Sequence, residues 1–162
     1  MFNPNAQSGH AALRKGRHSR PYQHYFITVC CTQRNALMAS DGAAKAAAMT
    51  LHKLHADGHL NLLAWVVMPD HLHVLLQLDE SKSLAVAVGR MHSCIAKAVN
   101  KSLGRVGTFW QQAYYESAVR HEGDTTRVIR YIVNNPIKAG LAETPGNYPY
   151  WNITGWNGVS FW

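Results

Sequence analysis

The sequence predicts an α+β fold in which a four-stranded antiparallel sheet packs against helices. Two apolar runs at 60–68 and 71–78 are joined by Met68-Pro69-Asp70. This connection is too short to hold a helix, so the two strands must be antiparallel. Two longer segments show apolar residues at helical spacing instead. The length of 162 residues favours one domain, and a hydrophobic content of 47% suffices for a core.

The expected strands are defined by β-branched and aromatic residues between turn signals. In chain order, the expected elements are a strand at 22–32, a helix at 43–57, strands at 60–68 and 71–78, a helix at 83–103, a strand at 114–119 and a helix at 125–134. Pro69 has no N–H to donate to a strand ladder, which suits the turn of the hairpin.

The expected helices are defined by apolar stripes and by end signals. The stripe of the second helix is the most regular and consists of Leu84, Val88, Met91, Ile95 and Val99. We expect Asp41, Ser83 and Asp124 as the three N-caps. Gly58 and Gly104 should end the first two helices, and Pro136 should stop the third.

The order β-α-β-β-α-β places two helices between the strands, so both should pack on one face of the sheet. This arrangement is ferredoxin-like, with an additional C-terminal helix. We expect a basic flexible arm at 1–20, the folded domain at 21–140 and an aromatic tail at 141–162 that packs on the domain or extends it.

The charge balance favours a polyanionic partner. Lys and Arg outnumber Asp and Glu by 16 to 9, which gives a formal charge of +7 and a pI near 9.5. Nucleic acid is the commonest partner of such proteins. The three cysteines show no Cys-x-x-Cys zinc pattern, and no apolar run approaches the roughly 20 residues of a membrane span. We expect a cytoplasmic protein with no membrane partner.

Two histidines form the first candidate site. His71 and His73 lie two residues apart on an expected strand, so both rings leave the same face. That spacing suits two ligands of one metal ion. Taken alone, however, a His-x-His pattern more often marks two ordinary histidines, one at the turn and one packed on a neighbour.

A tyrosine and an asparagine form the second candidate site. Tyr131 and Asn135 are four residues apart and should share one face of the third helix. A phenol and an amide there can complete a site begun by the histidines. The alternative is a packed tyrosine and an asparagine that only ends the helix.

Three motifs together resemble a known family. They are Trp65-Val-Val-Met-Pro-Asp-His71-Leu-His73-Val, Trp110-Gln-Gln-Ala-Tyr114-Tyr-Glu116 and Tyr131-Ile-Val-Asn-Asn135-Pro-Ile-Lys-Ala-Gly140-Leu. Their order and spacing resemble the single-tyrosine HUH (histidine-hydrophobic-histidine) DNA nucleases. The closer similarity is to the REP-associated tyrosine transposases, which are relatives of single-strand insertion-sequence transposases. The resemblance covers about residues 22–151.

The resemblance implies a role for each candidate residue. His71 and His73 match the metal-binding pair, and Tyr131 matches the nucleophile that forms a 5′-phosphotyrosine and releases a 3′-OH. Asn135 matches the third ligand, where insertion-sequence relatives often carry the longer Gln. The implied cofactor is Mg²⁺ or Mn²⁺, with no small-molecule cofactor. A monomer is expected, with a dimer left open, in a bacterial cytoplasm near the nucleoid.

The implied substrate is single-stranded or hairpin DNA of the repetitive extragenic palindromic (REP) type. Basic residues of the arm and of the region at the end of the second helix are the candidates for DNA binding: Arg14, Arg17, Arg20, Lys97, Lys101 and Arg105. Two alternatives to the endonuclease and strand transferase stay open. One is a non-catalytic protein that binds DNA hairpins. The other is a small RNA-binding domain, which should show aromatic residues where this chain has histidines.

Overall fold

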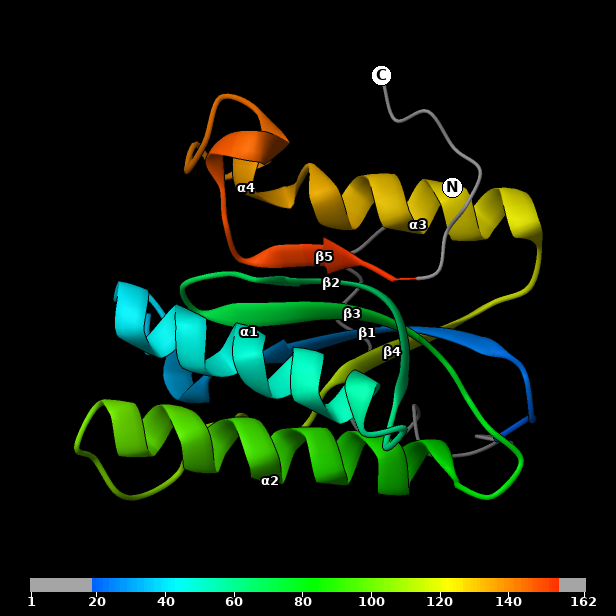
Figure 1. Cartoon of the computed structure of the whole chain (residues 1–162), viewed down its shortest axis with the longest axis horizontal. Helices are drawn as coiled ribbons and strands as arrows, with labels where there is room; N and C mark the ends of the chain where they lie inside the picture. Colours follow the sequence, from blue (N-terminus) through cyan, green and yellow to red (C-terminus); the bar gives the residue numbers. More distant parts are fainter. Residues whose placement is uncertain (1–18, 155–162) are drawn as a thin grey trace.

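The computed structural model describes residues 19–154, which form a sheet between two layers of helices (Figure 1). The elements are β1 (His24–Cys30), η2 (Thr32–Arg34), α1 (Asp41–Ala56), β2 (Asn61–Val67), β3 (His71–Gln77), α2 (Leu84–Ser102), β4 (Tyr115–Val119), α3 (Glu122–Val133), α4 (Asn135–Lys138), η3 (Pro145–Asn147) and β5 (Trp151–Ile153). None of the helices in this range has the length and apolar character that crossing a membrane demands.

The sheet is antiparallel throughout and has the order β4-β1-β3-β2-β5. The expected hairpin of β2 and β3 is confirmed, and Met68 closes it by donating its N–H to the carbonyl of His71 at 2.8 Å. The sheet has five strands rather than four, because β5 pairs with the outer edge of β2. A three-residue strand is too short to show a period in the sequence, and only its pairing defines it.

One face of the sheet carries the main core, under α1 and α2. Leu51 of α1 and Met91 and Ile95 of α2 are fully buried there, and so are Leu72 and Val74 of β3. The apolar stripes predicted for both helices therefore mark the buried faces, and the placement of these helices on one side is confirmed.

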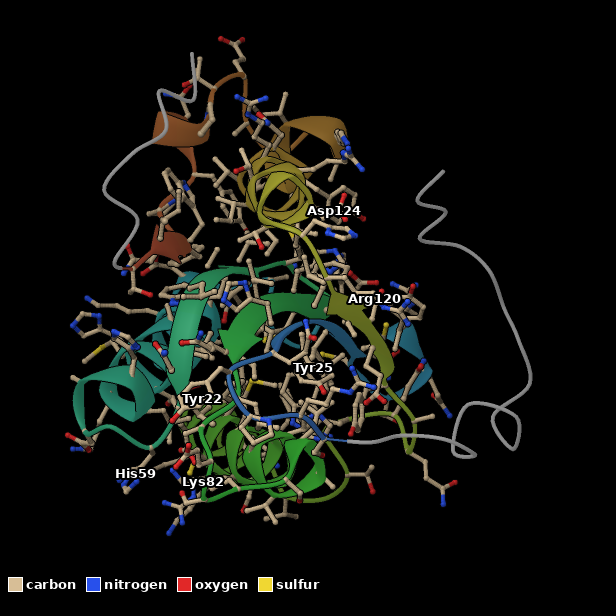
Figure 2. The ribbon with its side chains drawn as sticks, turned by 90° about the vertical axis from the view of Figure 1, so that its right-hand side faces the viewer. Tyr22, Tyr25, His59, Lys82, Arg120 and Asp124 are labelled. Atoms are coloured by element: carbon tan, nitrogen blue, oxygen red, sulfur yellow. The ribbon has the colours of Figure 1, made fainter. Side chains whose placement is uncertain are left out.

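The other face of the sheet carries a second core, under α3. Phe26, Leu75, Ile129 and Ile132 are at most 1% exposed in this cluster. The additional helix, α3, thus covers the face of the sheet on which His73 and Leu75 of β3 lie. Figure 2 shows the layers from the side, with Asp124 on α3 on one side of the sheet and Lys82 on the other.

Two of the three predicted N-caps are wrong. Ser40 caps α1, since its Oγ accepts from the N–H of Ala43 at 3.3 Å, and Asp41 is already helical. α3 begins at Glu122 after His121, so Asp124 lies inside its first turn. Ser83 does cap α2 by accepting from the N–H of Val86 at 3.3 Å. A carboxylate just inside a helix suits the helix dipole as well as a cap does, which explains the misassignment.

Ile129 tests the second core. Truncating Ile129 to Ala should lower the free energy of unfolding by about 2–5 kcal/mol, and Ile129→Val by about 0.5–1.5 kcal/mol. The loss arises because each change removes buried apolar atoms and leaves a cavity in the second core. Chemical denaturation followed by circular dichroism measures both values. Met49→Ala is the control, because Met49 is 63% exposed and should cost less than about 0.5 kcal/mol. Equal effects of the Ile129 and Met49 variants would contradict the assignment.

Candidate metal and nucleophile site

The two histidines of β3 converge on one point. The Nε2 atoms of His71 and His73 lie 3.2 Å apart, and the ring centres are 4.7 Å apart. A metal–nitrogen bond is about 2.1 Å long, so one ion can reach both nitrogens at this separation. The two rings therefore leave one face of β3, as the two-residue spacing predicted, and their role as metal ligands stays a prediction.

Asp70 orients the first histidine. Its Oδ1 accepts a hydrogen bond of 2.6 Å from Nδ1 of His71, and its Oδ2 lies 3.2 Å from Nη1 of Arg34. Burial alone would raise the pKa of Asp70, but the hydrogen bonds and charges of His71 and Arg34 outweigh it and hold this pKa below the ordinary value. With Nδ1 of His71 directed at the carboxylate, its Nε2 faces away from Asp70 and toward Nε2 of His73, an orientation found in many metal sites.

Thr28 of β1 orients the second histidine. Strand register places Thr28 opposite His73, and its Oγ1 lies 2.8 Å from Nδ1 of the ring. Burial lowers the pKa of His73 well below its ordinary value, and the nearby charges of His71 and Arg34 act in the same direction. The ring is therefore neutral. A hydroxyl either donates or accepts, so Thr28 is compatible with a free lone pair on Nε2 of His73.

Tyr131 of α3 lies against His73 from the helical layer that covers this face. Its ring centre is 5.3 Å from that of His73, at an interplanar angle of 69°. Phe26 of β1 completes the aromatic cluster, stacked on His73 at 5.4 Å and perpendicular to Tyr131 at 5.8 Å. The structure therefore brings together three of the four residues predicted for the site, from segments about sixty positions apart.

Asn135 does not share a continuous helix with Tyr131, and this part of the prediction is wrong. α3 ends at Val133, Asn134 has φ −87° and ψ 0°, and Asn135 opens the short helix α4. Pro136 has no N–H for the helical ladder, which accounts for the break. The side chain of Asn135 is 9% exposed, and its role as a third ligand stays a prediction. No group of three or more His, Cys, Asp or Glu side chains suited to a metal occurs within residues 19–154.

A groove opens beside Tyr131, between β4 and α3. It has a volume of about 800 Å³, and its lining includes Ser117, Arg127, Arg130, Asn134 and Lys138. The Nζ of Lys138 lies 4.8 Å from the centre of the Tyr131 ring, within the range of a cation–π contact. Half-buried Tyr131 lines this groove, whereas the buried His73 does not.

Of the predicted DNA-binding residues that the structure describes, Lys97 and Lys101 lie on the far side of the sheet from this site. Arg14 and Arg17 fall outside the described residues, and Arg20 is exposed just before β1. Lys97 and Lys101 are exposed on α2, which packs on the opposite face of the sheet from α3. The guanidinium of Arg105 donates to Oδ1 of Asn100 at 2.6 Å and to the carbonyl of Thr108 at 3.2 Å, so it shapes the turn after α2.

Sequence reasoning missed four neighbours of the site: Thr28, Asp70, Arg34 and Lys138. Asp70 was detectable, because a carboxylate next to a candidate histidine ligand is a common outer partner. Thr28 and Arg34 depend on how β1 and the turn after it meet β3, which no local signal reports. Lys138, seven residues after Tyr131, follows the helix break and shows its contact only in three dimensions.

Comparison with known proteins agrees with the motif resemblance. The REP-associated tyrosine transposase of Escherichia coli is 27% identical over 104 residues, covering 60% of this chain and 57% of the relative. A Haemophilus influenzae protein named as a candidate of the same kind is 26% identical over 98 residues, covering 54% and 56%. The chain thus spans a little over half the length of these relatives.

The fold is shared with a solved structure of a REP-associated tyrosine transposase bound to a REP hairpin. The TM-score is 0.67 at 24% sequence identity, covering 83% of this chain and 79% of the other. At that identity the likeness concerns the fold alone. A sequence model of the family described as "Transposase IS200 like" matches residues 20–135, which include His71, His73 and Tyr131. The chain belongs to the IS200-like transposase family.

Proposed function

We propose that this protein is a metal-dependent endonuclease and strand transferase that acts on single-stranded DNA carrying a palindromic hairpin of the REP type. The observation that carries the proposal is the contact between Tyr131 and the histidine pair. A phenol lies 5.3 Å, centre to centre, from the ring of His73, whose Nε2 is 3.2 Å from that of His71. Family membership, the net charge of +7 and the fold shared with a hairpin-bound transposase support DNA as the substrate.

The proposed reaction exchanges one phosphoester for another. The oxygen of Tyr131 attacks phosphorus, the bond from phosphorus to the 3′ oxygen breaks, and the products are a 5′-phosphotyrosine and a 3′-OH. The phenol gives up its proton to solvent, and the departing 3′ oxygen takes one up. Because the ester energy is kept in the covalent link, a 3′-OH can reverse the step and join strands.

The chain's own residues supply positioning and charge for this reaction. Asp70 and Thr28 fix the two imidazoles, and Lys138 places positive charge beside the ring of the nucleophile. His71 and His73 fit a divalent ion, with Asn135 as the candidate third ligand. Mg²⁺ or Mn²⁺, when bound there, supplies polarisation of a phosphate oxygen and stabilises the developing charge.

The tyrosine is the first test. Mixing the protein with a hairpin-bearing single-stranded oligonucleotide and Mn²⁺ should give a covalent adduct on a denaturing gel. Tyr131→Phe should abolish the adduct, because phenylalanine lacks the oxygen that attacks phosphorus. Tyr114→Phe is the matched control and should leave it, since Tyr114 packs against His92 on the other side of the sheet at 5.7 Å. Hairpin binding without any adduct from the native protein identifies the alternative, a non-catalytic hairpin-binding protein.

Metal binding is tested apart from catalysis by Mn²⁺ titration calorimetry on the Tyr131→Phe protein. His71→Ala and His73→Ala should each abolish measurable binding. Asp70→Asn should weaken it about 10–100-fold, the usual effect of losing an outer partner of a histidine ligand. His52→Ala, an exposed change on α1, is the control and should have no effect. Unchanged Mn²⁺ affinity in the His71 and His73 variants would refute the metal site.

The third ligand is tested with the two adjacent amides. Asn135→Ala should weaken Mn²⁺ binding in the same titration, and Asn135→Gln should preserve most of it, because Gln keeps an amide oxygen one methylene further out. Asn134→Ala is the matched control, since Nδ2 of Asn134 donates to the carbonyl of Arg130 at 2.9 Å and lines the groove instead. If Asn134→Ala weakens Mn²⁺ binding and Asn135→Ala does not, Asn134 is the ligand and our assignment of Asn135 is wrong.

A further inference from the structure

The segment that links β1 to α1 is attached at both ends to the turn before His71. The N–H of Cys31 donates to the carbonyl of Asp70 at 2.8 Å. The N–H of Met38 donates to the carbonyl of Pro69, also at 2.8 Å. The side chains of Cys31 and Met38 are at most 2% exposed and belong to the main core. The residues between them are therefore held in one place beside Asp70.

Two consecutive residues of this segment adopt a left-handed backbone although neither is glycine. Gln33 has φ 53° and Arg34 has φ 58°. This conformation costs free energy in a residue that carries a Cβ. Both side chains are exposed, so no burial offsets the cost. Strained residues of this kind are concentrated at functional sites, where the surrounding structure holds them in place.

The side chain of Arg34 contacts the carboxylate that orients His71. Nη1 of Arg34 lies 3.2 Å from Oδ2 of Asp70, and the arginine side chain is 58% exposed. An ion pair this exposed adds little to the free energy of unfolding. Stability therefore does not explain why an arginine occupies this strained position.

Asp70 is held from two sides, with one partner for each carboxylate oxygen. Oδ2 faces Arg34, and Oδ1 accepts a hydrogen bond of 2.6 Å from Nδ1 of His71. A carboxylate with two partners cannot turn about its Cβ–Cγ bond without breaking both contacts. Because an ionised carboxylate can only accept, the hydrogen of the neutral form of the His71 ring must lie on Nδ1. Nε2 of His71, which lies 3.2 Å from Nε2 of His73, is then left without a hydrogen.

We propose that Arg34 is a positioning residue for the histidine pair. By holding Oδ2 of Asp70, it keeps Oδ1 on Nδ1 of His71, and so keeps Nε2 of His71 free of hydrogen. The inference rests on the proposed function, because a free Nε2 serves the reaction only if the histidines bind a metal ion. Arg34 acts through Asp70 and is not itself a ligand in this role.

The position of the ring hydrogen is the first measurement. Long-range hydrogen–nitrogen correlation NMR spectra of the metal-free Tyr131→Phe protein show which nitrogen of each neutral histidine carries it. The His71 signal is assigned by its loss in His71→Gln. It should show the hydrogen on Nδ1 when Arg34 is present, and a mixture of both forms in Arg34→Gln, because a released Asp70 no longer fixes the ring. Arg34→Lys should retain the original pattern, since an ammonium can also donate to Oδ2.

Mn²⁺ titration calorimetry in the same Tyr131→Phe background is the second measurement. Arg34→Gln should weaken binding about three- to tenfold, which is less than the loss from Asp70→Asn. Removing a nearby cation favours a bound divalent ion by charge alone, so a weaker affinity has the sign of lost positioning and not of lost charge. In the Asp70→Asn protein, Arg34→Gln should cause no further loss, since the residue that it acts through has been changed.

Two glycine variants separate positioning from folding. Gln33→Gly and Arg34→Gly each relieve one left-handed residue, so neither should lower the free energy of unfolding much. Arg34→Gly should nevertheless reproduce the ring spectrum and the Mn²⁺ affinity of Arg34→Gln. Gln33→Gly is the matched control and should leave both measurements unchanged.

Three results overturn the inference: a His71 ring that keeps its hydrogen on Nδ1 in Arg34→Gln, an equal loss of Mn²⁺ affinity in the Asp70→Asn background, or the same effects from Gln33→Gly. Failure of the proposed function is separate, since it appears as the absence of Mn²⁺ binding and of an adduct from the native protein. The ring spectrum is recorded without metal, so it tests the role of Arg34 in either case.

Discussion

The packing of α3 onto the second face of the sheet is the constraint on which the site depends. Ile129 and Ile132 are fully buried against that face, together with Phe26 and Leu75. This contact carries Tyr131 to His73, although the two residues are far apart in the chain. Without it, the histidines would be two polar side chains on an open sheet face, and the phenol would lie on a helix with no partner. The second core is therefore part of the functional site as much as of the fold.

The electrostatics of the site follow from the same packing. Covering His73 keeps its pKa low and its ring neutral, as a metal ligand must be. Asp70 stays at the rim of the sheet, where His71 and Arg34 hold it ionised. One segment of chain, from α3 to α4, supplies both Tyr131 and the cations of the groove. A single helix packed against the sheet thus positions both the candidate site and the groove beside it.

The two edges of the sheet are used differently. β5 covers the outer edge of β2, and Tyr148 secures that end by donating its Oη to the carbonyl of Val67 at 2.7 Å. β4 forms the other edge and borders the groove. An open edge exposes backbone groups that natural proteins usually cover or occupy.

The sequence by itself determined the α+β class, the hairpin of β2 and β3, the buried stripes of α1 and α2, and the identity of His71, His73 and Tyr131 as a set. These depend on local period, on turn residues and on motif spacing, which are properties of short segments. The fifth strand, the break before Asn135, and the partnerships of Thr28, Arg34 and Lys138 were decided only by tertiary structure. Each depends on which segments meet across the sheet, and a contact between distant segments leaves no period in either one.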